Sequence, residues 1–83
     1  MVILVTEVGR LPELRDITQR EAVRAFVRLG GVERRGKGSH RIVRMPNGRN
    51  VSIPSGLVRT GLLRDAIKVA GFTVEEFLQA LGR

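Results

Sequence analysis

The sequence predicts an α+β domain in which one helix, a three-stranded antiparallel meander, a second helix and a short third helix follow one another. Three observations lead to this prediction. The runs Thr18–Glu21 and Thr73–Glu76 each precede apolar residues at helical spacing. Glycines at 30–31 and at 71 follow helical patterns and can end them. The turn at Pro46–Gly48 separates two short segments of strand-forming residues.

The first helix begins after Thr18. The Thr18 hydroxyl and the Glu21 carboxylate can each satisfy an unpaired backbone N–H, the pattern called a capping box. Arg20, Arg24 and Arg28 recur every four residues and so share the other side of the helix. The apolar residues that follow form one helical stripe, which we expect to face the core: Ala22, Val23, Phe26, Val27 and Leu29.

Three strands follow, and the Asn47–Gly48 pair predicts the turn between the last two. Asn-Gly favours a two-residue type I′ turn, because both central residues of that turn need positive φ. The predicted strands are 32–35, 40–45 and 50–53, with a turn at 36–39.

The predicted turn also fixes a register for the hairpin. The expected partners are Met45 with Asn50, Arg44 with Val51 and Ile42 with Ile53. Alternation puts His40, Ile42 and Arg44 on one face and Arg41, Val43 and Met45 on the other. Neither face is cleanly apolar, and a bulge near Gly38 or Met45 would change the facing.

The C-terminal third predicts two helices. One spans about 60–70, and a second capping box at Thr73–Glu76 begins the other. The apolar residues are Leu62, Leu63, Ala66, Ile67 and Ala70 in the first, and Phe72, Val74, Phe77, Leu78 and Leu81 in the second.

The chain divides into a lead-in at residues 1–16 and a main domain at residues 17–83. Val2–Val5 can form a short strand, while Gly9 and Pro12 interrupt any longer element. The lead-in is therefore either an arm or an added edge strand.

Composition excludes several classes of protein. A chain of 83 residues is one domain, and its lack of cysteine excludes disulfides and thiolate metal sites, as expected in a reducing cytoplasm. The N-terminal apolar run Met1–Val5 is too short to span a membrane, so we expect a soluble cytoplasmic protein. A single histidine cannot build a zinc site, so no metal or other cofactor is expected.

The positive charge is concentrated in the middle of the chain. The formal net charge is +7, and residues 34–64 hold eight Lys and Arg residues with no Asp or Glu. A concentrated basic segment is typical of a protein that binds nucleic acid. An acidic protein partner could share the same face.

The run "LGGVERRGKGSHRIVRMPNGRNVSIPSG" followed by "TGLLRDAIKVAGFTVEEFL" resembles the HicA (YcfA-like) mRNA interferase toxins, over about residues 17–81. The resemblance implies a fold like a double-stranded-RNA-binding domain, ribosome-independent cleavage of mRNA, and neutralisation by a HicB-type antitoxin. It also implies that His40, in the Gly-Ser-His motif, is catalytic. The residues expected to contact RNA are Lys37, Gly38, Ser39, Arg41, Arg44, Arg49 and Arg59.

The chain departs from the family pattern at four places. Arg41 follows the motif histidine, where a second His or an aromatic residue is common. Arg59-Thr60-Gly61 replaces a common Lys-Gly-Thr, and the loop after Pro54 is short. The lead-in at residues 1–16 is longer than is typical of the family. The short loop puts the details of RNA or antitoxin contact in doubt.

RNA chemistry is compatible with a single histidine. The 2′-OH of RNA can attack the adjacent phosphate, and an imidazole can take or give a proton near neutral pH. Neighbouring basic residues, Lys37, Arg41 or Arg44, can stabilise the charge that builds on the phosphate. The group that transfers the second proton stays open between water, Ser39 and the RNA itself.

Two other functions remain open alongside the enzyme. One is an RNA-binding module without catalysis, in which His40 only hydrogen-bonds a phosphate or a carbonyl group. The other is an interaction protein whose basic face docks an acidic antitoxin. We expect the free toxin to be a monomer.

Overall fold

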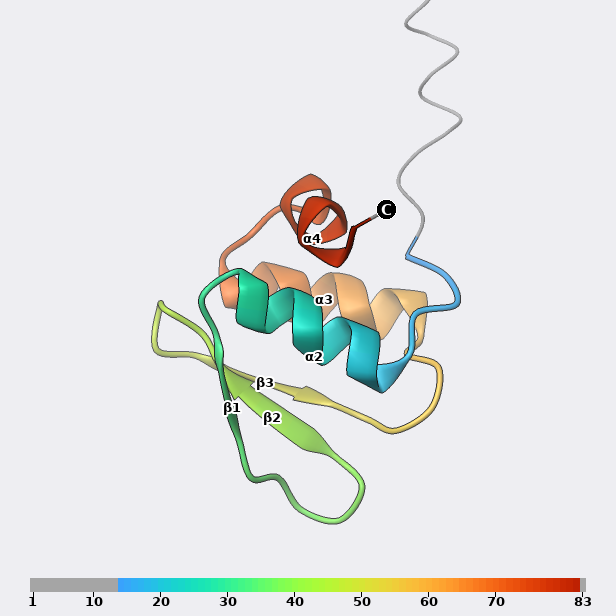
Figure 1. The fold of residues 1–83 in the computed structure, drawn as a ribbon, viewed down its shortest axis with the longest axis vertical. Coiled ribbons are helices and arrows are strands. Elements are labelled where there is room, and N and C mark those ends of the chain that lie inside the picture. Colours follow the sequence, from blue (N-terminus) through green and yellow to red (C-terminus); the bar gives the residue numbers. More distant parts are fainter. Residues whose placement is uncertain (1–13, 83) are drawn as a thin grey trace, which may run out of the picture.

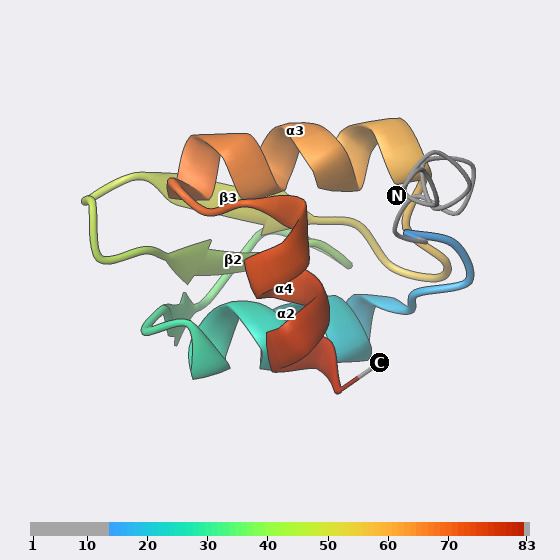
Figure 2. The ribbon, with the colours of Figure 1, turned by 90° about the horizontal axis from the view of Figure 1, so that it is seen from above.

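A computed structural model describes residues 14–82, in which two helices cover one face of a three-stranded sheet (Figure 1). The sheet is antiparallel in the order β1-β2-β3, and the last helix packs across the first (Figure 2). The elements are α2 (Gln19–Arg28), β1 (Val32–Arg34), β2 (Arg41–Arg44), β3 (Asn50–Ile53), α3 (Thr60–Ala70) and α4 (Val74–Leu81). The predicted α+β order is confirmed, with the helix and sheet layers of a double-stranded-RNA-binding-domain-like fold.

The predicted helix ends are confirmed. Thr18 and Thr73 are the N-caps of α2 and α4, and both capping boxes are formed. Gly71 ends α3 in the left-handed conformation, with φ at 86°. Arg59 precedes α3 and makes no side-chain capping hydrogen bond.

The hairpin between β2 and β3 differs from the prediction by one residue. The Gly48 N–H donates to the Met45 carbonyl (2.8 Å), and the Met45 N–H donates to the Arg49 carbonyl (2.8 Å). The loop therefore has three residues, with Pro46 at the position that favours proline in a type I turn and Gly48 at φ +86°. Asn47 does not have the positive φ that a type I′ turn would require.

This shift changes which side chains of β3 face the helices. Arg44 pairs with Asn50, Val43 with Val51, Ile42 with Ser52 and Arg41 with Ile53. The predicted alternation along β2 holds, since Val43 and Met45 are buried while Arg44 is exposed. The predicted partners of Met45, Arg44 and Ile42 are all wrong, because the extra loop residue turns Val51 and Ile53 to the helix side. The helix side of the sheet is consequently more apolar than predicted.

Three strand ends also differ from the prediction. β1 ends at Arg34 and β2 runs from Arg41 to Arg44, so Arg35, His40 and Met45 lie outside the strands. Arg35 and His40 belong instead to the loop that joins β1 to β2, and Met45 begins the hairpin turn.

The core lies between the sheet and the helices. The rings of Phe26 and Phe77 meet with centroids 5.0 Å apart, and both side chains are fully buried. Burial of such a side chain contributes about 1.5–3 kcal/mol. Leu14 is also buried, and the Thr60 hydroxyl donates to its carbonyl (3.1 Å), so the packed domain reaches back at least to Leu14. The predicted boundary between residues 16 and 17 stays a prediction, and Val2–Val5 lies outside the described residues.

Candidate nucleic-acid interface

The only histidine lies on the loop between β1 and β2, at one end of the sheet. Within this loop the His40 N–H donates to the Lys37 carbonyl (3.1 Å) and closes a turn. Gly38 is the first central residue of the turn, with φ at +58°. Lys37, Gly38, Ser39 and His40 are all exposed, so the loop presents the Gly-Ser-His motif to solvent.

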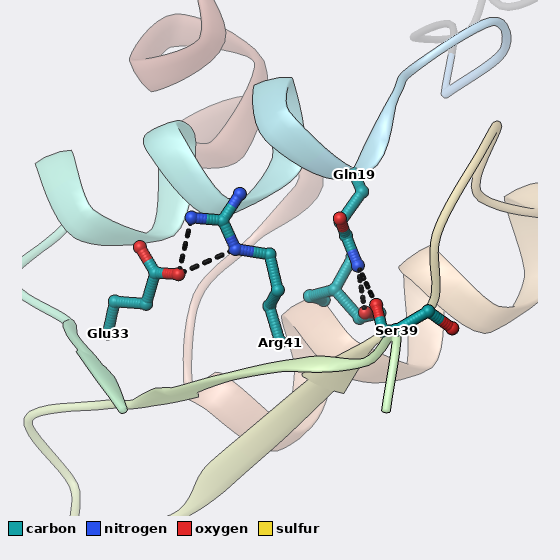
Figure 3. Close-up of polar contacts among 5 residues, drawn as sticks. Gln19, Glu33, Ser39 and Arg41 are labelled. Carbon is teal, nitrogen blue, oxygen red and sulfur yellow. Dashed lines mark hydrogen bonds and ion pairs between the residues drawn. The ribbon is translucent and has the colours of Figure 1, made fainter. Parts of the chain in front are cut away.

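Gln19 fastens this loop to the rest of the fold (Figure 3). Its side-chain amide donates to the Ser39 carbonyl (2.7 Å) and to the Ile53 carbonyl (2.9 Å). One side chain at the start of α2 therefore holds both the residue before His40 and the end of β3. Sequence reasoning missed Gln19, because its partners lie 20 and 34 positions away along the chain.

Gly36 brings the two ends of the loop into close backbone contact. A Cβ atom added at Gly36 would collide with the carbonyl oxygen of His40 and lie 2.9 Å from its carbonyl carbon. Only glycine permits this approach without displacement of the backbone. The backbone around His40 is thus fixed by Gly36 on one side and by Gln19 on the other.

Arg41 lies on the helix side of β2 and pairs with Glu33 of β1 (Figure 3). Its Nε donates to the Glu33 carboxylate (2.6 Å), and its Nη2 lies 2.6 Å from the same oxygen. Both side chains are partly exposed, at 42% and 37%. Arg41 therefore has a carboxylate partner in this state, which the sequence did not predict.

The other predicted cations are spread over the molecule. Arg44 lies on the outer face of the sheet, away from the helices, and is exposed. Arg49 lies at the β2–β3 hairpin, the opposite end of the sheet from the His40 loop (Figure 1). Arg59 lies just before α3, whose first turn is near the start of α2 (Figure 1). The structure thus gathers residues 37–40 into one loop and distributes the three arginines.

Arg44 lines a hollow on the outer face of the sheet, with a volume of about 330 Å³. Arg34 and Arg35 also line this hollow, although neither was among the predicted contact residues. The remaining lining residues are Ile42 and Asn50. Over the part of the chain that the structure describes, none of these three arginines forms an ion pair.

A family model for the HicA toxin of bacterial toxin–antitoxin systems matches residues 20–72. The chain belongs to the HicA toxin family. The matched region covers the His40 loop, the hairpin and α3, while α4 and Gln19 lie outside it. No curated protein matches the chain.

Membership of the HicA family implies an antitoxin partner, since its members are toxins of toxin–antitoxin systems. Residues 14–82 offer no sign of a membrane span or of a metal site. None of the helices there has the length and apolar character needed to cross a membrane. Nowhere in the same range do three His, Asp or Glu side chains form a group that could hold a metal ion.

Proposed function

We propose that this HicA-family toxin is a metal-independent endoribonuclease, an mRNA interferase that uses His40 as its catalytic residue. The observation that carries this proposal is the placement of the chain's only histidine. His40 is exposed on a loop that a helix side chain and a close glycine contact hold in position. A general acid–base catalyst must be both accessible to its substrate and held in a defined geometry.

The proposed reaction uses a nucleophile that the RNA itself supplies. The 2′-oxygen forms a bond to phosphorus as the bond from phosphorus to the 5′-oxygen breaks. His40 takes the proton from the 2′-OH or gives one to the departing 5′-oxygen. The other proton transfer falls to water, Ser39 or the RNA. Neighbouring cations, with Lys37 in the same turn, stabilise the charge on the phosphate oxygens.

The decisive experiment compares wild type with His40→Gln on a long RNA in EDTA. Glutamine keeps a hydrogen-bonding side chain but cannot exchange a proton near neutral pH, so we expect cleavage by wild type alone. A Lys68→Gln variant, changed on the exposed side of α3, controls for general effects of substitution. Wild type that leaves RNA intact while still binding it would instead indicate an RNA-binding module without catalysis.

The nucleophile can be tested separately with a chimeric substrate. DNA that contains a single ribonucleotide offers only one 2′-OH, so cleavage is expected only at that nucleotide and should leave a 2′,3′-cyclic phosphate. All-DNA of the same sequence is expected to stay intact. Cleavage of the all-DNA strand would contradict attack by the 2′-OH.

We further propose that the antitoxin is of the HicB type and that the toxin acts on mRNA in the cytoplasm. The family supports the existence of an antitoxin, and the concentrated positive charge supports a nucleic-acid substrate. Coexpression of the toxin with the protein encoded beside it, followed by purification of the complex, tests the partner. Addition of that protein should stop cleavage by the wild type.

A further inference from the structure

We propose that the hollow on the outer face of the sheet binds the phosphate backbone of single-stranded RNA and leads the strand to His40. The binding is independent of catalysis, whereas the delivery of the strand to His40 for cleavage rests on the proposed function. Three of the five residues that line the hollow of about 330 Å³ are arginines, namely Arg34, Arg35 and Arg44. Guanidinium is planar and always charged, and it offers paired N–H donors that match phosphate oxygens.

The strand register separates the charges between the two faces of the sheet. Arg34 pairs with Ile42, and Arg44 pairs with Asn50, so these side chains share the outer face. Glu33 pairs with Val43 and lies on the helix side, where Arg41 engages it. The one carboxylate among the strands is therefore directed away from the hollow. An anion bound at the outer face therefore contacts arginine side chains, and no carboxylate from the strands lies beside it to repel it.

The direction of β2 connects the hollow to the proposed catalytic residue. The His40 loop leads directly into β2, whose first residue is Arg41 and whose last is Arg44. At about 3.3 Å per residue, the loop end of β2 and Arg44 are roughly 10 Å apart along the strand. A strand of RNA held at Arg34 and Arg44 can therefore continue toward the His40 loop.

The composition of the face predicts recognition of the backbone and not of the bases. The chain has no Trp or Tyr, and its three aromatic residues are phenylalanines. Phe26 and Phe77 are fully buried, and Phe72 packs against the core. The outer face thus lacks the aromatic side chains on which proteins commonly stack bases. Binding should depend strongly on salt and weakly on sequence.

The test measures binding with a probe that cannot be cut. The probe is a twelve-nucleotide, mixed-sequence, single-stranded RNA with 2′-O-methyl groups, titrated with wild type, Arg34→Gln, Arg44→Gln and the double variant. Arg24→Gln is the matched control, because it removes the same charge from the exposed side of α2. Fluorescence anisotropy at several salt concentrations gives both the affinity and its salt dependence.

The double variant is expected to bind about tenfold more weakly or worse, since each arginine makes a charge-assisted hydrogen bond to phosphate. The plot of log K against log salt should become shallower by about 0.7 for each phosphate that the variant no longer neutralises. Arg24→Gln should change both quantities much less. Equal weakening in Arg24→Gln and in each single variant would overturn the assignment, because binding would then follow net charge alone. Unchanged RNA binding would also overturn it, and impaired antitoxin binding in that case would assign the face to the antitoxin.

The outcomes also separate this site from the proposed catalysis. If wild type binds the probe through Arg34 and Arg44 but cuts no RNA, the hollow stands and the endoribonuclease proposal fails. If wild type cuts RNA and the double variant binds and cuts equally well, the endoribonuclease proposal stands and the hollow fails.

Discussion

Replacement of Gly36 by alanine is expected to destabilise the fold and to displace the loop that carries His40. The added Cβ would lie 2.9 Å from the His40 carbonyl carbon and still closer to the carbonyl oxygen. A carbon–carbon contact of about 3.5 Å is comfortable, so the two backbones must separate by roughly 0.6 Å or more. Both neighbouring atoms belong to the backbone, which cannot rotate away as a side chain can. Such overpacking typically costs about 1–3 kcal/mol.

The assay compares unfolding in urea with Gly61→Ala as the matched control. Gly61 lies in the first turn of α3, and a Cβ added there would have no neighbour within 4 Å. Alanine is the better helix former by up to about 1 kcal/mol, so this control should be as stable as wild type or slightly more stable. In thermal unfolding, a loss of 1 kcal/mol lowers Tm by about 4–8 °C in a domain of this size.

The position of the loop can be followed at the same time by NMR. Gly36→Ala should shift the backbone amide resonances of His40 and Arg41, while Gly61→Ala should leave them unchanged. Gly36→Ala protein with wild-type stability and unshifted His40 resonances would refute the reasoning, because the close approach would then have relaxed at no cost.

Three further predictions concern the contacts around the candidate site and the helix caps. Gln19→Leu removes two hydrogen bonds and should lower the free energy of unfolding, measured in urea, by about 1–3 kcal/mol. The control is Gln79→Leu, the same change at an exposed position of α4, which should lower it much less. Thr73→Ala removes the N-cap of α4 and should cost about 0.5–2 kcal/mol, with helix content measured by circular dichroism; an unchanged midpoint would contradict the cap's contribution. Glu33→Gln breaks a partly exposed ion pair with Arg41 and should change the free energy of unfolding by less than about 1 kcal/mol. The change also makes Arg41 available to RNA, so the affinity for the RNA probe should rise or stay level. Weaker binding would count against a contact between Arg41 and RNA.

The helices could be predicted from sequence because their signals are local. Thr18 caps a backbone N–H only three residues ahead, and Thr73 does the same, so both capping boxes formed where the pattern indicated. Gly71 similarly ends α3 through its own backbone conformation. In these cases no distant part of the chain needs to be known.

The hairpin shows where local signals compete. Asn47–Gly48 favours a two-residue turn, but Pro46 is also favoured at the second position of a type I turn, and that turn formed. The Asn47 side chain adds a long-range contact, because it donates to the Val69 carbonyl of α3 (3.0 Å). One extra loop residue was enough to reverse the facing of β3, since side chains alternate along a strand.

By itself, the sequence determined the α+β order, the helix caps, the segregation of positive charge into residues 34–64 and the family resemblance that a family model confirms. Only the tertiary structure decided which side chains meet: Gln19 with Ser39, Glu33 with Arg41, and Arg34 with Arg44 around one hollow. The physical reason is the range of the interactions. Caps and charge runs depend on neighbours in the chain, whereas these contacts depend on a register and a packing that bring distant residues together.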